Sequence, residues 1–509
     1  MLAKVISSAL HGIDAIPVEV EVDIAQGLPQ FATVGLPDGA VKESKDRVKS
    51  ALKNSGYDFP SRKITVNLAP ADIKKEGAAF DLPISVGILA ATGVVKETHL
   101  KKYLLMGELS LDGSVKPVRG CLPVAVMARE AGFAGIVVPN ENAGESAVVE
   151  GIEVIGVSEL AEVVEFLNGD RAIPPCRLDI QELFRQNAEH GEDFAEVKGQ
   201  EHAKRALEVA AAGGHNLLMI GPPGSGKTML ARRIPSILPR MSFTEAIETT
   251  KVYSVMGLLD RDRALITGRP FRSPHHTISD IGLIGGGNTP RPGEVSLSHN
   301  GVLFLDELPE FKKHVLEVLR QPLEDGRVTI SRALASITYP SRMMLVSAMN
   351  PCKCSGNPAN PDSCTCSMRE VLQYRSRISG PLLDRIDIHI EVPAVKYREL
   401  ADRAEGESSA AIAKRVEAAR EIQLERFRGT KVHCNAHMTP RQIRKFCEPD
   451  AGGHRLLEVV TEKLGFSARA YTRILKVSRT IADLQGTENI SEQHIAEAIQ
   501  YRSLDRKTV

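Results

Sequence analysis

The sequence predicts an α/β protein with three successive segments. Over residues 1–170, strand patterns such as IPVEVEVDI alternate with helical patterns such as VKESKDRVKSALKNSG. Strands and helices alternate again over residues 194–395, around glycine-rich and acidic motifs. In the last segment, residues 396–509, the patterns are only helical, as in AAIAKRVEAAREIQLERF. A proline-containing charged stretch, residues 171–193, is typical of a linker between the first two segments.

Composition excludes several classes of protein. The chain has 509 residues, of which 42% are hydrophobic and 25% charged, as in ordinary globular proteins. Lys+Arg and Asp+Glu both number 64, so binding to nucleic acid would need a local basic patch or a pore. No apolar run reaches the ~18 residues of a membrane span, so no membrane partner is expected. Eight cysteines, four of them in one short cluster, fit a reducing compartment, and we expect a cytoplasmic protein.

The segment HNLLMIGPPGSGKTMLARRI predicts a phosphate-binding loop between an apolar strand and a helix. Backbone N–H groups of such a loop cradle phosphates at the helix N-terminus. Lys227 is expected to reach the β- and γ-phosphates, and Thr228 to bind Mg²⁺. The predicted nucleotide-binding residues are Gly221, Pro222, Pro223, Gly224, Ser225, Gly226, Lys227 and Thr228.

Two further apolar strands end in polar residues that suit the same reaction. GVLFLDELPEF ends its strand at Asp306 and Glu307, of which the first suits the Mg²⁺ shell and the second the attacking water. RMMLVSAMNP ends in Asn350, whose amide suits orientation of the same water; the alternative is an ordinary turn residue before proline. Arg385, in SGPLLDRIDIHI, suits insertion into a neighbouring subunit's site. The local sequence favours instead a salt bridge from Arg385 to Asp384 or Asp387.

Two segments next to these motifs have no obvious place in nucleotide chemistry. VTISRALASITYP (Val328–Pro340) alternates apolar and polar residues and predicts a β-hairpin with Arg332 near its turn. CKCSGNPANPDSCTC supplies four thiols, which suit one tetrahedral Zn²⁺ or remain free thiols: Cys352, Cys354, Cys364 and Cys366.

In this order the motifs resemble an AAA+ ATPase, and PFRSPHHTISDIGLIGGGNTPRPGEVSLSHNGVLFLDELPEF with AMNPCKC resembles the magnesium-chelatase-like group. Within that group nearly the whole chain resembles the ComM/YifB family of competence-associated proteins. The resemblance implies a P-loop AAA+ module with a C-terminal helical lid. The preceding segment resembles the α/β proteolytic domain of Lon (ribosomal S5 domain 2-like). The nucleophile and base positions of Lon fall on Ala79 and Leu122, so peptide hydrolysis is expected to be lost.

The resemblance also assigns roles. It makes Gly221–Thr228 the Walker A loop, Asp306 and Glu307 the Walker B pair, and Asn350 sensor 1. Other implied positions are the arginine finger Arg385, the sensor 2 Arg469 with Arg473 in reserve, and Val197, Gly199 and Gln200 near the adenine. An insertion at about residues 269–294 and the hairpin would face the pore of a homo-hexamer, where Arg332 would contact DNA phosphate. Basic residues of the insertion are Arg269, Arg272, His275, His276 and Arg291.

We therefore expect a hexameric ATP-driven DNA motor, a helicase or branch-migration enzyme. It would act on single-stranded or branched DNA and support homologous recombination in natural transformation. Its expected cofactors are ATP, Mg²⁺ and a structural Zn²⁺. The alternative is an ATP-dependent protein-remodelling or chelatase-type motor subunit that acts on a protein partner.

Overall fold

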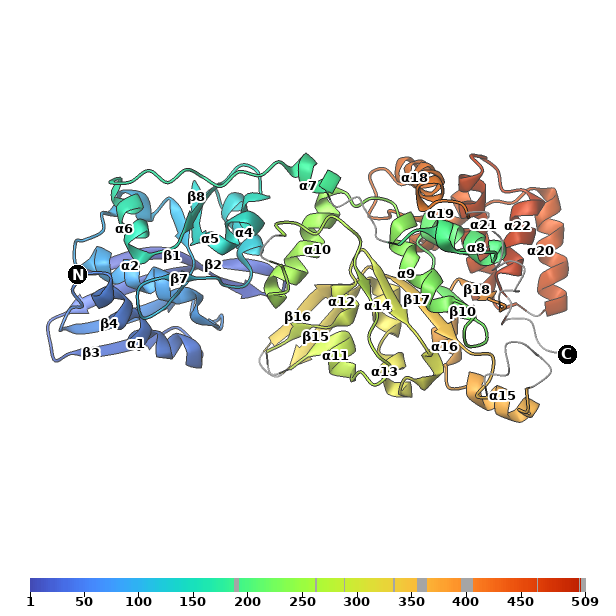
Figure 1. Ribbon diagram of the computed structural model, residues 1–509, viewed down its shortest axis with the longest axis horizontal. Coiled ribbons are helices and arrows are strands. Elements are labelled where there is room, and N and C mark those ends of the chain that lie inside the picture. Colours follow the sequence, from blue (N-terminus) through green and yellow to red (C-terminus); the bar gives the residue numbers. More distant parts are fainter. Residues whose placement is uncertain are drawn as a thin grey trace. The chain divides into compact units, whose positions relative to one another are not determined.

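The computed structural model describes residues 1–186, 192–260, 263–287, 289–332, 335–354, 364–394, 406–464, 466–502 and 504. The chain divides into two compact units, neither of which is one continuous stretch (Figure 1). Unit 1 contains Met1–Gln186 and Phe243–Ile266, and unit 2 contains Asn187–Ser242 and Thr267–Val509. The sequence predicts residues 243–266 in the central segment and a separate helical segment, whereas residues 243–266 lie in unit 1 and the helical segment lies in unit 2 with the parallel sheet. The predicted boundary at 395/396 falls outside the described residues.

Unit 1 is built on a seven-stranded mixed sheet in the order β3-β4-β2-β1-β5-β8-β9. In the core of unit 1, α2 packs on β1 and β2, α1 packs on α2, and α4 packs on β2 and α5; these four helices are labelled in Figure 1. The strands of unit 1 are β1 (Leu2–His11), β2 (Asp14–Ala25), β3 (Gln30–Val34), β4 (Lys63–Ala69), β5 (Tyr103–Leu105), β6 (Glu108–Leu109), β7 (Val115–Lys116), β8 (Gly135–Pro139) and β9 (Glu153–Val157). Its helices are α1 (Gly39–Asn54), η1 (Ala78–Phe80), α2 (Asp81–Ala91), α3 (Glu97–Leu100), α4 (Cys121–Glu130), α5 (Asn140–Ala147), α6 (Leu160–Asn168), α7 (Ile180–Gln186) and α10 (Phe243–Met256).

Helix α10 reaches unit 1 from the middle of the chain and packs on α4. Ser254 fixes it there, since its Oγ donates to the buried Glu145 at 2.6 Å and its carbonyl accepts from Gly120 N at 3.2 Å. Burial raises the pKa of Glu145, while the hydrogen bonds from Ser254 and Asn142 oppose that rise. The contacts make α10 part of the unit 1 core.

Unit 2 is built on a five-stranded parallel sheet in the order β11-β14-β17-β10-β18. The residues of β10, β14 and β17 are all buried, as expected for a parallel sheet covered on both faces. The strands of unit 2 are β10 (Leu217–Ile220), β11 (Phe271–Arg272), β12 (Gly285–Gly286), β13 (Arg291–Pro292), β14 (Val302–Leu305), β15 (Arg327–Arg332), β16 (Ala335–Pro340), β17 (Met344–Met349) and β18 (Ile388–Glu391).

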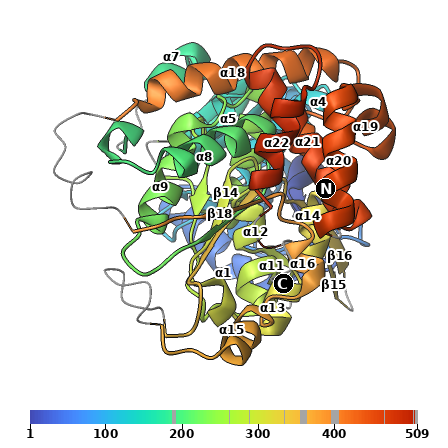
Figure 2. The same cartoon turned by 90° about the vertical axis from the view of Figure 1, so that its right-hand side faces the viewer.

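Along the chain, some helices of unit 2 come before or between these strands and others come after them. Figure 2 shows the later ones, α18 to α22, in orange to red. Those that precede or interrupt the sheet are η2 (Phe194–Glu196), α8 (Glu201–Gly213), α9 (Lys227–Ile237), α11 (Asp280–Ile284), α12 (Glu294–Leu297), η3 (Leu308–Glu310), α13 (Lys313–Glu317), α14 (Arg320–Asp325), α15 (Met368–Arg375) and α16 (Gly380–Leu383). Those that follow the sheet are α18 (Ser409–Arg426), η5 (Asn435–His437), α19 (Pro440–Phe446), α20 (Ala451–Leu464), α21 (Ala468–Leu484) and α22 (Glu492–Gln500). Helices α18 and α21 both pack on α8, so the helical segment shares the core of the sheet. No helix among the described residues combines the length and hydrophobicity needed to cross a membrane.

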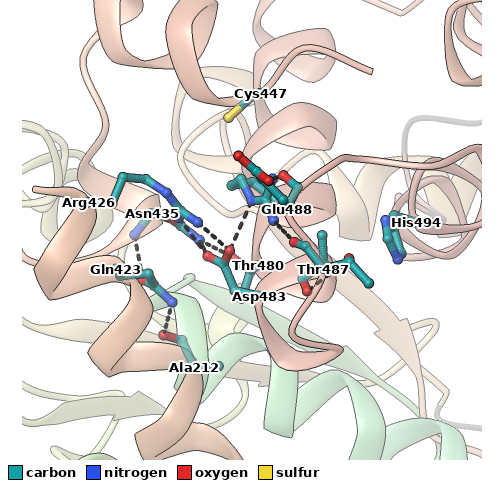
Figure 3. Close-up of polar contacts among 12 residues, drawn as sticks. Ala212, Gln423, Arg426, Asn435, Cys447, Thr480, Asp483, Thr487, Glu488 and His494 are labelled. Carbon is teal, nitrogen blue, oxygen red and sulfur yellow. Dashed lines mark hydrogen bonds and ion pairs between the residues drawn. The ribbon is translucent and has the colours of Figure 1, made fainter. Parts of the chain in front are cut away.

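A buried polar network fixes the helical segment (Figure 3). The carboxylate of Asp483, on α21, accepts from Arg426 Nη1 at 2.7 Å, Asn435 Nδ2 at 2.8 Å and Arg479 Nε at 3.0 Å. Gln423 extends the network to the core, because its Nε2 donates to Ala212 O, at the end of α8, at 3.1 Å. Asp483 thereby ties α18 and η5 to the helix that carries Arg469.

Candidate functional site

The carboxyl ends of three neighbouring strands place the predicted nucleotide residues at one edge of the sheet. Ile220 pairs with Met349, so Gly221 and Asn350, which follow them, leave the sheet side by side. Leu305 pairs with Ser347, which brings Asp306 to the same edge. This edge is the usual ligand site of open α/β sheets.

The loop between β10 and α9 has the backbone that its glycines predict. Gly224 and Gly226 have φ values of 74° and 84°, which residues other than glycine rarely adopt. Gly221 is needed for space, since a Cβ built there would lie 2.2 Å from the carbonyl oxygen of Val392. The loop therefore requires glycine both for backbone conformation and for close approach to β18.

Lys227, the first residue of α9, turns its ammonium into this loop. Nζ donates to Gly221 O at 2.7 Å and Pro222 O at 2.8 Å, and it lies 3.4 Å from Asn350 Oδ1. Burial lowers the pKa of Lys227, while the charges of Asp306 and Glu307 oppose the shift. The structure thus brings the predicted loop lysine, the sensor amide and the acidic pair together.

Two predicted Mg²⁺ ligands are in direct contact. Thr228 Oγ1 donates to Asp306 Oδ2 at 2.7 Å, and Asp306 Oδ1 accepts from Glu307 N at 2.9 Å. A hydroxyl and a carboxylate side by side are oxygen donors of the kind that Mg²⁺ prefers, beside the place where a phosphate would lie. The donor set therefore fits Mg²⁺.

Glu307 has a strained backbone and a partner that the sequence analysis did not predict. Its φ of 52° and ψ of 46° lie in the left-handed region, which costs free energy for any residue except glycine. Its Oε2 lies 3.5 Å from Nδ1 of His276, whose ring packs against His275 and Phe311. The insertion that carries His276 therefore touches the predicted catalytic carboxylate. The only sequence signal was the pair of histidines shortly after β11.

Gln200 lies against the phosphate loop from the side of η2. It is the N-cap residue of α8, with a φ of 58°. Its Nε2 donates to Ser225 O at 2.7 Å and to Pro393 O at 3.3 Å. Val197 is buried just before it, and Gly199 has a φ of 62°. The segment predicted to lie near adenine thus adjoins both the loop and the end of β18.

The structure gives Arg385 a partner different from the two that the local sequence favoured. Its Nη1 donates to Pro381 O at 2.7 Å, and its Nη2 forms an ion pair with Glu324. Asp384 pairs instead with Arg469, at 2.8 Å, and Asp387 with Arg473, at 2.7 Å. Arg385 therefore does form a salt bridge, but with Glu324, which lies 61 residues away in the sequence.

Burial distinguishes the two candidate sensor 2 arginines on α21. Asp387, the partner of Arg473, is fully buried and also contacts His215 Nδ1 at 3.1 Å. The positive charge of Arg473 and the hydrogen bond with His215 hold the pKa of Asp387 far below its usual range in spite of burial. Arg473 is thus committed to neutralising a core carboxylate. The side chain of Arg469 is 67% exposed, so it is the one with freedom to reach a ligand.

The predicted hairpin forms from β15 and β16, in a register that runs from Arg327–Pro340 to Arg332–Ala335. It packs on the insertion, because Tyr339 Oη donates to Pro290 O at 2.7 Å and a Cβ on Gly286 would lie 3.2 Å from Arg332 Nη2. Arg332 is exposed, as a phosphate contact requires.

Two arginines counted as basic residues of the insertion are structural. Arg272 is neutralised by both oxygens of Glu294, at 2.6 and 2.7 Å, and Arg269 donates to Pro239 O and Asn300 O. Fewer free positive charges therefore remain in the insertion than the sequence indicated.

The four clustered cysteines converge, and the loop between them, residues 355–363, lies outside the described residues. Sulfur atoms of Cys352, Cys354 and Cys364 are 3.4–3.5 Å apart, and all four sulfurs lie within 4.8 Å of one another. Tetrahedral zinc with 2.3 Å bonds separates its sulfurs by roughly 3.8 Å. The four thiols therefore fit a zinc ion, which would lie directly after Asn350.

Comparison with known proteins agrees with this geometry. Three family models match: Subunit ChlI of Mg-chelatase over residues 20–142; Magnesium chelatase, subunit ChlI over residues 193–400; and its C-terminal model over residues 406–502. Competence protein ComM of Haemophilus influenzae is 45% identical over 509 residues, which cover 99% of this chain and 98% of that protein. The chain belongs to the ComM/YifB family.

Other relatives match the whole chain or only part of it. Protein YifB of Escherichia coli is 44% identical over 99% of this chain and 98% of its own length. The magnesium-chelatase 38 kDa subunit of Rhodobacter capsulatus is 26% identical over 41% of this chain and 61% of its own length. The predicted family is confirmed, and with it a magnesium-chelatase-like AAA+ fold with a parallel sheet. Membership of this ComM/YifB group implies ATP hydrolysis with Mg²⁺.

Proposed function

We propose that this ComM/YifB member is the subunit of a hexameric ATP-driven DNA motor that unwinds DNA or migrates branched junctions. One observation carries the proposal: the hairpin and the insertion pack on each other, the insertion contacts the proposed catalytic residue Glu307, and Val328 and Thr329 of the hairpin line a pocket together with Arg385. His276 of the insertion reaches Glu307, and Arg385 pairs with Glu324 just before β15. Movement of a polymer along the hairpin would therefore change the positions of the proposed catalytic residues. The name of the Haemophilus relative, a competence protein, supports a role in recombination of incoming DNA during natural transformation.

The reaction is hydrolysis of ATP to ADP and phosphate by attack of water on the γ-phosphorus. Mg²⁺ bound by Thr228 and Asp306 would neutralise charge on the phosphate oxygens. The loop Gly221–Thr228 holds the phosphates, and Lys227 exchanges its carbonyl contacts for phosphate oxygens. Glu307 accepts the proton of the water, and Asn350, beside Lys227, orients that water. Val197, Gly199 and Gln200 hold the base.

We assign Arg385 and Arg469 to the charge that develops on the γ-phosphate. Arg385 acts on the site of the next subunit, so activity needs a ring, and Arg469 acts from the helical lid. Arg332, close to the turn of the hairpin, contacts DNA phosphate in the pore. Six copies of that residue would concentrate positive charge although the chain is neutral overall.

Two further assignments complete the proposal. Cys352, Cys354, Cys364 and Cys366 bind a structural Zn²⁺ that braces Asn350. None of the eight cysteines, all of which are among the described residues, forms a disulfide; this reduced state is maintained in the cytoplasm, where we place the protein. Unit 1 is a Lon-like domain without peptide hydrolysis. Ala79 lies in η1 and the buried Leu122 in α4, and neither side chain has a nucleophile or base.

The second candidate is a chelatase-type or protein-remodelling motor that acts on a protein partner. The matches to magnesium-chelatase models and to the Rhodobacter subunit favour it. It requires the same ATPase chemistry, so only the polymer substrate distinguishes it from the first.

The test is the steady-state ATPase rate of the full chain with no polymer, single-stranded DNA, a four-way junction, or unfolded protein. The DNA motor predicts stimulation by DNA, steepest with the junction, that declines as salt rises. Arg332→Ala is expected to remove most of that stimulation. Stimulation by unfolded protein alone would favour the second candidate, and a rate that no polymer changes would overturn the DNA substrate.

A further inference from the structure

Arg385 is largely buried and paired within its own subunit, although we propose that it acts on the site of another subunit. Its side chain is only 14% exposed, with Nη1 on Pro381 O and Nη2 on Glu324. The hydrogen bond from Arg385 is the largest cause of a lowered pKa at Glu324. An arginine in this position has to leave Glu324 before it reaches a neighbour's phosphate.

Glu324 also occupies a special place in the chain. It lies near the end of α14, and after Asp325 and Gly326 the hairpin strand β15 begins at Arg327. Gly326 has a φ of 65°, a conformation that redirects the chain from helix to strand. A force on Glu324 therefore acts three residues before Arg327, the first residue of the hairpin.

A pocket of about 550 Å³ lies at this junction. Its lining includes Arg385 and Glu324, Val328 and Thr329 of β15, and Ile284 of α11 in the insertion. The proposed arginine finger, the hairpin and the insertion, whose movements the proposed motor has to coordinate, therefore border the same pocket. The pocket gives Arg385 room to change rotamer without a clash in a packed core.

We propose that Glu324 is a positioning residue for Arg385: it holds the finger against the foot of the hairpin until the next subunit's site takes it over. This inference rests on the proposed function, since it assumes that Arg385 acts in trans. The contact with Glu324 and the contact with a neighbouring γ-phosphate use the same guanidinium and exclude each other. Withdrawal of Arg385 then frees the helix end that leads into β15, and displacement of the hairpin by DNA loosens the hold on Arg385.

The test compares Glu324→Gln with Asp325→Asn in the full chain. Gln keeps the size of Glu324 but removes the charge that holds Arg385. Asp325 lines the same pocket on the same helix, and its substitution removes an equal charge without touching the ion pair. Glu324→Asp keeps the carboxylate and reports whether charge or side-chain length matters.

We expect Glu324→Gln to raise kcat without DNA by about five-fold or more, the lower end of typical coupling between sites. KM for ATP is expected to stay constant, because the phosphate loop is untouched. Stimulation by DNA should decrease by a similar factor, since part of the restraint is already gone. Asp325→Asn and Glu324→Asp should remain close to the wild type.

Arg385→Ala separates failure of this inference from failure of the proposed function. If Arg385→Ala abolishes hydrolysis while Glu324→Gln matches Asp325→Asn, the finger stands and the role of Glu324 is overturned. If Arg385→Ala keeps the wild-type rate, the trans finger itself is overturned, and the inference with it. An equal increase for Glu324→Gln and Asp325→Asn would also overturn it, since a general charge effect would then explain both.

Discussion

Replacement of Asp483 by Asn tests the polar network that anchors the helical segment. Asp483 is fully buried, and the side chains of its partners Arg426 and Arg479 are only 12% and 3% exposed. Asn has nearly the same size, so no cavity forms and the change in stability reports the lost charge. Two guanidinium groups would then remain buried without a carboxylate (Figure 3).

The structure sets the expected magnitude. Removal of one partner from a buried ion pair typically costs about 3–5 kcal/mol, because the other charge stays buried. Arg479 keeps its bonds to the carbonyls of Thr487 and Glu488, at 2.6 and 2.5 Å, and these continue to solvate it. We therefore expect Asp483→Asn to lower the free energy of unfolding by about 3 kcal/mol, the lower end of that range.

The assay is denaturant unfolding of the full chain followed by far-UV circular dichroism, with midpoints compared at a common slope. Glu425→Gln is the matched control, since Glu425 is 67% exposed in its pair with Arg428 and such pairs contribute at most about 1 kcal/mol. A loss for Asp483→Asn no larger than that of the control would refute the argument that this charge holds α18 and η5 on α21.

Other predictions concern the catalytic base, zinc and acid stability. Glu307→Gln should bind ATP normally and slow hydrolysis by about 10²–10⁴-fold in a single-turnover assay, the usual contribution of a general base; a wild-type rate would remove Glu307 from that role. Elemental analysis should find about one zinc per chain and almost none in Cys352→Ser/Cys364→Ser; equal zinc in both would exclude the cluster as its site. Burial lowers the pKa of His389 to about 3, against ~6.5 in an unfolded chain. The folded form therefore stays neutral while the unfolded form gains a proton below pH ~6.5, so stability should decrease by up to ~1.4 kcal/mol per pH unit between pH 6 and 4. His389→Gln should flatten this slope, and an unchanged slope would assign it to other groups.

Local chemistry explains how much of the site was predictable. Strand, glycine loop and helix are contiguous from Leu217 to Ile237, so their pattern identified the phosphate loop before any tertiary contact was known. Asp306 and Asn350 were also predictable, because each follows a short, wholly buried strand. The hairpin was predictable from alternation alone.

Charge partners and domain membership were not predictable in this way. Arg385 had two acidic residues within two positions, yet tertiary packing gave it Glu324, 61 residues away. Arg272 counted as a basic residue until the fold placed Glu294 beside it. Nothing in the sequence of α10 indicates that its buried face, with Ala246 and Val252, is completed by α4. Such pairings depend on the fold as a whole.

The division of unit 1 into two stretches of chain has consequences for its synthesis and for its dissection. A ribosome that has translated the first 186 residues has made only part of this unit, and α10 emerges later, after β10 and the phosphate loop. Folding of unit 1 can therefore finish only once residue 266 is available, when part of the nucleotide core already exists. A fragment that starts after Gln186 would keep α10 and lose its packing partners. An isolated ATPase fragment should therefore have residues 243–266 replaced by a short linker. A fragment that keeps them is expected to aggregate through the exposed apolar face of α10.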